Sequence, residues 1–155
     1  MIYNEKAIVI STNEIACNTF QTFLHSPQIA KITLPGQFIN ILPSKDWGNV
    51  MRRPMSVASQ ENGDISIIYK VVGPGTHIMK NWEIDEVVDI IGPLGNYWDN
   101  YKGFHPVLIG GGVGIAPILN LHNMLRNEQF KHTLVMGAQG KRDHFMEHNV
   151  SKRIY

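Results

Sequence analysis

Short runs of alternating apolar and polar residues fill the first two thirds of the chain, and each run ends at a turn signal. The clearest run covers residues 64–71 and follows the pair Asn62-Gly63, which favours a tight hairpin turn. A period of two residues predicts a β-strand with one apolar face. The positions on that face are Ile65, Ile67, Tyr69 and Val71.

Five further segments have strand-like patterns, at residues 3–11, 15–25, 37–42, 53–59 and 86–91. Turn signals such as Ser26-Pro27 and Pro35-Gly36 separate them. Six short strands with turns between them predict a small closed antiparallel barrel over residues 1–100. One helix, near residues 76–82, is expected to cap it.

The pattern changes near residue 103. Residues 106–109 form a continuous apolar run, typical of a parallel strand buried on both faces. A glycine-rich turn then opens a helix expected to end near Arg126, residues 131–137 form another apolar strand, and a further helix is expected from Asp143. This order predicts a parallel α/β nucleotide-binding domain over residues 103–155. We expect it to be incomplete, because residues 103–155 leave room for two strands and about two helices, fewer strands than an open parallel sheet usually has.

Composition narrows the possible functions. The chain has 155 residues, 43% of them hydrophobic, and a formal net charge of +1, so no basic surface for nucleic acid is expected. Cys17 is the one cysteine, which excludes a disulfide framework, and its alternating surroundings predict a small buried side chain. The beginning of the chain lacks a long apolar stretch, and the longest apolar run, residues 107–119, is too short to span a membrane. We therefore expect a cytoplasmic protein with neither a nucleic-acid nor a membrane partner.

The stretch from Arg53 to Ser56 is the first candidate binding segment. Arg53 and Ser56 are three positions apart on a strand, so their side chains point to opposite faces. Pro54 favours extended geometry and lacks an N–H group, which suits an edge position. The segment could hold a long flat ligand, with Arg53 on a phosphate. The alternative is an ordinary surface arginine on an edge strand.

A glycine turn at residues 73–76 leads into the expected capping helix. Free N–H groups and the positive end of a helix dipole at such a turn suit a pyrophosphate. Thr76 could add a hydroxyl donor or serve as the helix N-cap, and the two roles are compatible.

A second glycine turn precedes the expected helix of the α/β domain. It differs from the common dinucleotide fingerprint because Pro117 stands where a third glycine is wanted, and no acidic residue follows the second strand. Pro117 costs little in a first helical turn, where the N–H groups lack partners. The turn either binds a dinucleotide pyrophosphate or connects strand and helix without a ligand.

Five stretches of the sequence, in order and spacing, resemble the ferredoxin reductase-like flavoproteins. Within that family the resemblance is strongest to the electron-transfer subunits of type B dihydroorotate dehydrogenases. The stretches are Pro35-Gly36-Gln37-Phe38, residues 52–56, residues 68–76, Gly92-Pro93-Leu94-Gly95-Asn96 and residues 110–117.

The resemblance implies an FAD-binding barrel and particular contacts to FAD. Arg53 would pair with the FAD pyrophosphate, Met55 would replace a tyrosine that often stacks on the flavin, and Ser56 would lie near the reactive edge of the ring. The remaining implied FAD contacts are Pro54, Ile68, Tyr69, Lys70, Gly75 and Thr76. The implied contacts to NAD(P) are Gly111, Gly112, Val113, Gly114 and Pro117.

The resemblance also implies partners. It predicts a flavin-dependent oxidoreductase component that passes electrons between a catalytic dihydroorotate dehydrogenase subunit and NAD(P) in pyrimidine biosynthesis. An unpaired edge of the short parallel sheet also predicts a homo-oligomer or a partner chain. An iron–sulfur cluster, which the resemblance implies in a cysteine-rich tail, needs about four ligands, and Cys17 stands alone. The alternatives are a free-standing NAD(P)H-dependent flavin or ferredoxin reductase and a non-enzymatic flavin-binding remnant.

Overall fold

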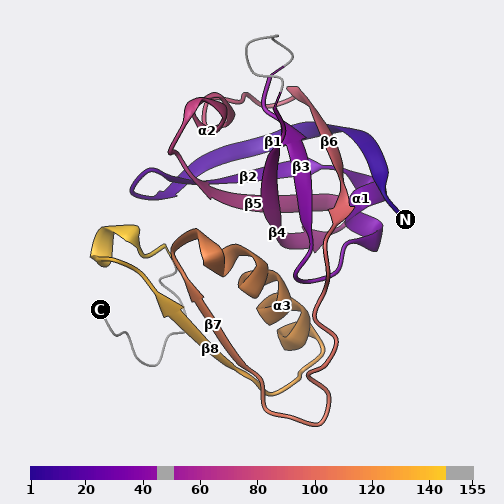
Figure 1. Cartoon of the computed structure of the whole chain (residues 1–155), viewed down its shortest axis with the longest axis vertical. Helices are drawn as coiled ribbons and strands as arrows, with labels where there is room; N and C mark the ends of the chain where they lie inside the picture. Colours follow the sequence, from indigo (N-terminus) through magenta and orange to yellow (C-terminus); the bar gives the residue numbers. More distant parts are fainter. Residues whose placement is uncertain (45–50, 146–155) are drawn as a thin grey trace.

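Six antiparallel strands close into a barrel in the first part of the chain (Figure 1). The computed structural model describes residues 1–44 and 51–145. Around the barrel the strands follow the order β1-β2-β5-β4-β3-β6, which confirms the predicted antiparallel barrel. Their bounds are β1 Tyr3–Ala16, β2 Thr19–His25, β3 Phe38–Leu42, β4 Arg53–Glu61, β5 Asp64–Lys70 and β6 Val87–Leu94.

The barrel interior is filled by the alternating apolar residues of these strands. Ile39, Ile65 and Ile67 are fully buried there, as the period-two pattern predicts. The predicted hairpin at Asn62-Gly63 is also confirmed, because both residues have positive φ, 53° and 89°.

The first hairpin differs from the prediction. β1 continues to Ala16 and turns through Cys17 and Asn18, where Asn18 has a φ of 52°. Cys17 is therefore exposed at a turn, and the prediction of a buried cysteine was wrong. The turn was missed because asparagine supplies the positive φ here without a neighbouring glycine.

Two short helices accompany the barrel, and only α2 was expected. α2, Pro74–Met79, begins two residues earlier than predicted, with Gly73 at its N-cap. α1, Pro27–Ile32, follows the Ser26-Pro27 break. Its first turn is capped from a distance by the Glu5 carboxylate, which accepts hydrogen bonds from Ser26 Oγ (2.5 Å) and the backbone N–H of Ile29 (3.1 Å). A local sequence pattern does not reveal a cap supplied by another strand.

A β-α-β unit follows the barrel, as predicted. β7 Val107–Gly111 pairs in parallel with β8 Thr133–Gly137, and α3 Ile115–Asn127 connects them. The predicted burial of residues 106–109 on both faces was wrong, because Val107 and Ile109 are 56% and 67% exposed. Near the predicted last helix the structure has only a short 3-10 turn, Lys141–Asp143; residues 146–155 lie outside the described part of the chain. The division into domains at residues 100 and 103 stays a prediction.

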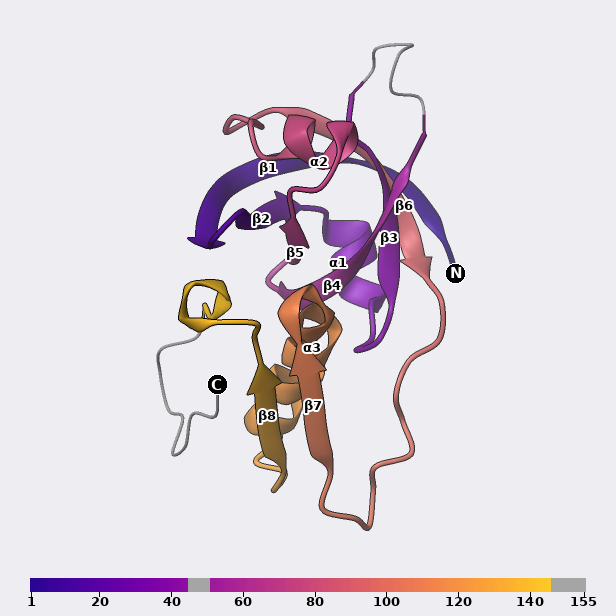
Figure 2. The ribbon, with the colours of Figure 1, turned by 60° about the vertical axis from the view of Figure 1, so that its left-hand side comes forward.

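α3 runs alongside the two-stranded sheet, and both lie below the barrel in the views of Figures 1 and 2. Ile115, Ala116 and Leu119 of the helix form one buried cluster with Ala58 of β4 and Ile68 of β5. The α/β unit, residues 107–145, is therefore joined to the outer face of the barrel at β4 and β5.

Candidate functional site

The barrel is open along one stretch between β4 and β5, here called the seam. The β4–β5 ladder begins at the pair Val57–Ile67. Residues 53–56 pair with β3 alone and residues 68–70 with β2 alone, within the described part of the chain. Pro54 thus occupies a local edge, where its missing N–H group breaks no β4–β5 hydrogen bond. The sequence-predicted FAD contacts of the two strands all lie along this seam.

The seam has two sides. Met55 packs against the barrel core, and alternation along β4 places Arg53 on the same side, where it meets α2. Ile68 packs on the outer side against the α/β unit, and alternation places Ser56 and Lys70 there too. Arg53 and Ser56 therefore point to opposite sides of the seam. The side of Arg53 faces α2 and is called the α2 side; the side of Ser56 faces the α/β unit and is called the α/β side.

Arg53 lies directly over the first turn of α2. A Cβ atom added to Gly75 would come within 2.7 Å of Arg53 Nε and 3.2 Å of Cζ. A side chain at position 75 would force the guanidinium away, so glycine is what lets Arg53 and α2 approach each other. Two segments that are distant in sequence thereby form one cradle.

Arg52, the residue before Arg53, has an acidic partner. Arg52 donates hydrogen bonds to the carboxylate of Asp89 at 2.5 Å and to the carbonyl oxygen of Asp89 at 3.1 Å, and Lys6 pairs with the same carboxylate. Burial would raise the pKa of Asp89, but the hydrogen bonds from Lys6 and Arg52 outweigh it and lower the pKa. Arg53 donates to the carbonyl oxygen of Met51 at 2.8 Å and has no acidic partner among residues 1–44 and 51–145. Arg53 is thus the arginine with charge to offer an anion.

The Thr76 hydroxyl closes the turn before α2. It accepts hydrogen bonds from the N–H groups of Val72 (3.0 Å) and Gly73 (3.2 Å) and donates to the Gly73 carbonyl (3.1 Å). This arrangement favours a capping role for the side chain, although Thr76 lies inside the helix and Gly73 is the N-cap. The N–H groups of Gly75 and Thr76 lie in the first helical turn, where no intrahelical acceptor exists.

Tyr69 turns its side chain away from any ligand in the seam. The ring is buried in the barrel, stacks on Phe20 with centroids 6.2 Å apart, and its hydroxyl lies 3.1 Å from Thr22 Oγ1. Burial raises the pKa of Tyr69 to about 12, with the Thr22 hydrogen bond acting in the opposite direction. At the seam, Tyr69 can therefore contribute only backbone groups.

The predicted NAD(P)-binding turn lies against β5, the strand that contains Tyr69. The turn of Gly112 to Gly114 contacts β5 and is exposed, and a Cβ added at either glycine would meet nothing within 4 Å. Gly112 has a φ of 52°, which favours glycine. Pro117 lies in the first turn of α3, as expected. The fold thus brings both glycine turns to the borders of β5.

Two of the motif stretches have a structural use. Gln37 donates from Nε2 to the carbonyl oxygen of Gly95 at 3.2 Å, and the Pro35 carbonyl accepts from the N–H of Trp98 at 3.1 Å. These bonds fasten the segment after β6 to the barrel. Residues 35–38 and 92–96 therefore hold the linker in place.

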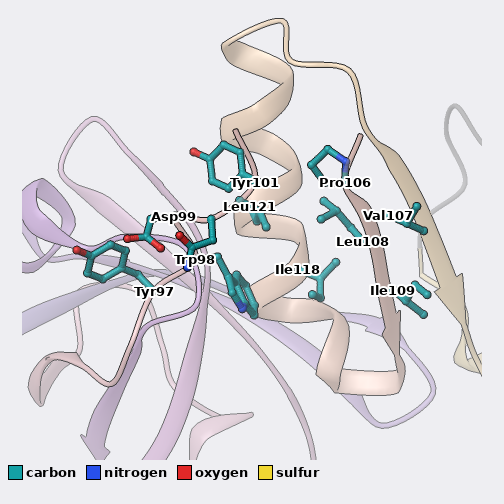
Figure 3. Close-up of a pocket in the computed structure, with 11 residues that line it drawn as sticks. Tyr97, Trp98, Asp99, Tyr101, Pro106, Val107, Leu108, Ile109, Ile118 and Leu121 are labelled. Carbon is teal, nitrogen blue, oxygen red and sulfur yellow. The ribbon is translucent and has the colours of Figure 1, made fainter. Parts of the chain in front are cut away.

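A pocket that sequence reasoning missed lies beside that linker. It has a volume of about 440 Å³, and Figure 3 shows Trp98 and Tyr101 beside α3 with Leu108 of β7. Burial, followed by the charges of Glu128 and Asp99, raises the pKa of Tyr101. The aromatic composition of residues 97–104 was the available signal, but nothing in the sequence brings it together with β7 and α3. None of the predicted site residues lines this pocket.

Two further properties concern only the part of the chain that the structure describes. No cluster of three or more histidine, cysteine or acidic side chains there could hold a metal ion. No helix there has both the length and the apolar character needed to cross a membrane.

Comparison of the sequence with known proteins gives a consistent set of relatives. No protein-family model matches the chain. It is 33% identical, over 97% of its length, to the dihydroorotate dehydrogenase B (NAD(+)) electron transfer subunit of Lysinibacillus sphaericus (strain C3-41). The subunit of the same name from Fusobacterium nucleatum subsp. nucleatum is 30% identical over 96% of the chain. The chain spans about 60% of the length of these curated relatives.

Solved structures agree on the fold. A chain from the structure of the NADH-dependent reduced ferredoxin-NADP oxidoreductase matches 92% of this chain with a TM-score of 0.80 and 30% identity, and 51% of that chain is covered. Ferredoxin-NADP+ reductase from Plasmodium falciparum matches 92% of this chain and 62% of its own, with a TM-score of 0.74 and 16% identity, which shows the fold alone. The chain therefore has the ferredoxin reductase-like fold, as its motifs predicted.

Proposed function

We propose that this chain, a relative of the dihydroorotate dehydrogenase B electron transfer subunits with the ferredoxin reductase-like fold, binds FAD in the barrel seam. In that role it would pass electrons between a dihydroorotate dehydrogenase-type catalytic subunit and NAD(P), in pyrimidine biosynthesis. The observation that carries the proposal is the position of Arg53. This arginine lies over Gly75 at the seam and lacks an acidic partner among the described residues.

The residues at the seam fit a dinucleotide. A pyrophosphate carries two negative charges and needs several donors; Arg53 and the first-turn N–H groups of Gly75 and Thr76 supply them from two directions. Because glycine has no side chain, Arg53 can lie close to this turn. Backbone groups of residues 68–70 and the half-buried Ser56 would line the remainder of the ligand.

The side chains act by binding and orientation. When bound, FAD supplies the chemistry itself, since a flavin accepts two electrons with a hydride and can release them singly. Arg53 would fix the pyrophosphate, and Met55 would pack from the core side. No general acid or base is required of the chain.

NAD(P) would bind at the turn of Gly111 to Gly114, with Pro117 tolerated in the first turn of α3. The exposed N–H groups of this turn and the adjoining helix suit a pyrophosphate. Its contact with β5 would bring this cofactor to the α/β side of the seam.

A second candidate is a free-standing reductase. The similarity in sequence and structure to the NADH-dependent reduced ferredoxin-NADP oxidoreductase favours it. Turnover of NADH with a simple acceptor, in purified protein without any dehydrogenase subunit, would support the free-standing enzyme. Reduction of the acceptor only after a dihydroorotate dehydrogenase subunit is added would support the electron-transfer subunit.

The arginine pair provides the test of FAD binding. Replacement Arg53→Ala is expected to weaken FAD binding about 10- to 100-fold, since a charge-assisted hydrogen bond contributes about 1.5–3 kcal/mol. Arg52→Ala removes the same charge one residue away, but from the Asp89 pair, so FAD affinity should stay near that of the original protein. Flavin fluorescence titration measures both. Equal affinities in the Arg53→Ala and unmodified proteins would remove Arg53 from the site.

A further inference from the structure

The turn after β8 reaches back onto the barrel (Figures 1 and 2). The Cys17 N–H, in the β1–β2 hairpin, donates to the Arg142 carbonyl oxygen at 3.0 Å. Phe145 packs against the buried cluster that contains Ile68. The end of the α/β unit is therefore attached beside the seam.

The same turn also supplies an acid to the seam. Lys70 Nζ donates to Asp143 Oδ1 at 3.2 Å, and the two side chains are 42% and 27% exposed. A pair this exposed adds little to stability. Its larger effect is electrostatic, because the carboxylate cancels the charge of Lys70 and fixes the position of its ammonium group.

The two sides of the seam therefore differ in charge. On the α2 side, Arg53 has no acidic partner among the described residues, whereas on the α/β side Lys70 is paired with Asp143. We propose that Asp143 is a positioning residue that neutralises Lys70, so that the dianionic pyrophosphate of a dinucleotide is directed to Arg53 and its uncharged ring to the α/β side. This inference rests on the proposed binding of FAD in the seam.

If Asp143 neutralises Lys70, removing either charge should change FAD affinity, in opposite directions. Asp143→Asn leaves an unpaired ammonium group beside the seam and should tighten FAD binding, while Lys70→Gln leaves an unpaired carboxylate and should weaken it. Each change is expected to be about threefold to tenfold, the size of one partly screened charge near the ligand. The double variant removes both charges and should bind within about twofold of the original protein.

The orientation of the ligand can be tested through Arg53. If Asp143 keeps the phosphates away from Lys70, removal of the carboxylate gives them a second cation to approach. The loss of FAD affinity on Arg53→Ala should then be about threefold to tenfold smaller in the Asp143→Asn background.

The experiment is a set of FAD titrations by flavin fluorescence at low salt, repeated at high salt, where the differences should shrink. Glu128→Gln is the control, because it removes an exposed acid from the same unit at the end of α3. Opposite effects that cancel in the double variant support the proposal. It is overturned if both single variants weaken binding, as a purely structural contact would, or if Asp143→Asn behaves like Glu128→Gln. Failure of the unmodified protein to bind FAD would overturn the proposed function, and this inference with it.

Discussion

The barrel and the α/β unit each contain a glycine turn that leads into a helix, but the sheets that hold these turns differ in how completely they are packed. In the barrel every strand lies between two neighbouring strands, and the apolar residues of the interior are buried. The α/β unit has two strands in its described part, with α3 on one face and exposed Val107 and Ile109 on the other. Its contacts with the barrel include those of α3, of the turn at Gly112 and of the residues around Asp143.

This difference separates the two proposed cofactor sites. The FAD seam is built from strands and a helix of the barrel, and the α/β unit adds the Lys70–Asp143 pair beside it. The turn at Gly112 depends on a two-stranded sheet that is marginal without further packing. We therefore expect FAD affinity to persist under changes to the α/β unit that abolish NAD(P) binding.

The largest expected effect compares one substitution in both regions. Ile67→Ala, at a fully buried position of the barrel, should lower the free energy of unfolding by about 2–5 kcal/mol. Ile109→Ala, at a position 67% exposed on the sheet, should change it by less than about 0.5 kcal/mol. Urea denaturation followed by circular dichroism measures both. A large loss from Ile109→Ala would mean that the outer face of the sheet is covered in solution.

Alkaline pH tests how tightly the barrel is closed. The pKa of Tyr69 is about 12 in the folded protein and 10 for an ordinary tyrosine, as in the unfolded chain. Between these values the unfolded state binds fewer protons, so stability falls as pH rises, by about 2–3 kcal/mol in total from this group. The decline attributable to Tyr69 should be absent in Tyr69→Phe. Parallel pH curves for the two proteins would show that the hydroxyl is not buried.

The barrel could be predicted from sequence because its signals are local. Alternation marked the strands, and Asn62-Gly63 fixed one hairpin. The missed elements depend on partners elsewhere in the chain, as in the α1 cap supplied by Glu5. The prediction that Cys17 is buried was wrong because the alternating pattern continues across the turn. That turn is formed by the positive φ of Asn18, without a glycine to mark it.

The candidate site shows the same division. Motif resemblance selected Arg53, Lys70 and Gly75, and the fold brings them to the seam. The sequence did not reveal that Arg52 is paired with Asp89 while Arg53 is not, because that distinction requires β6 beside β3. The Lys70–Asp143 pair could not be predicted either, because its partners are 73 residues apart and only the fold brings them together.

The glycine turn of the α/β unit provides a smaller test. Gly112 has a φ of 52°, so Gly112→Ala should be destabilising by about 1–2 kcal/mol through backbone strain alone. Gly114 has a φ of −64°, so Gly114→Ala should be neutral or stabilising by up to about 1 kcal/mol. Hydrogen exchange of α3 amides measures both locally. Similar exchange in the two variants would show that the turn relaxes freely and that the unit does not fix its conformation.

The smallest expected effect on stability concerns the exposed face of the two-stranded sheet. The open sheet predicts a homo-oligomer or a partner chain, so the purified protein should associate as its concentration rises. Ile109→Lys places a charge on that face and should abolish association while changing stability by less than about 0.5 kcal/mol. Ile84→Lys is the matched control, because Ile84 is 68% exposed and belongs to the segment before β6. Light scattering that finds a monomer throughout would mean that this face needs no second copy; equal loss of association in both variants would place the contact elsewhere.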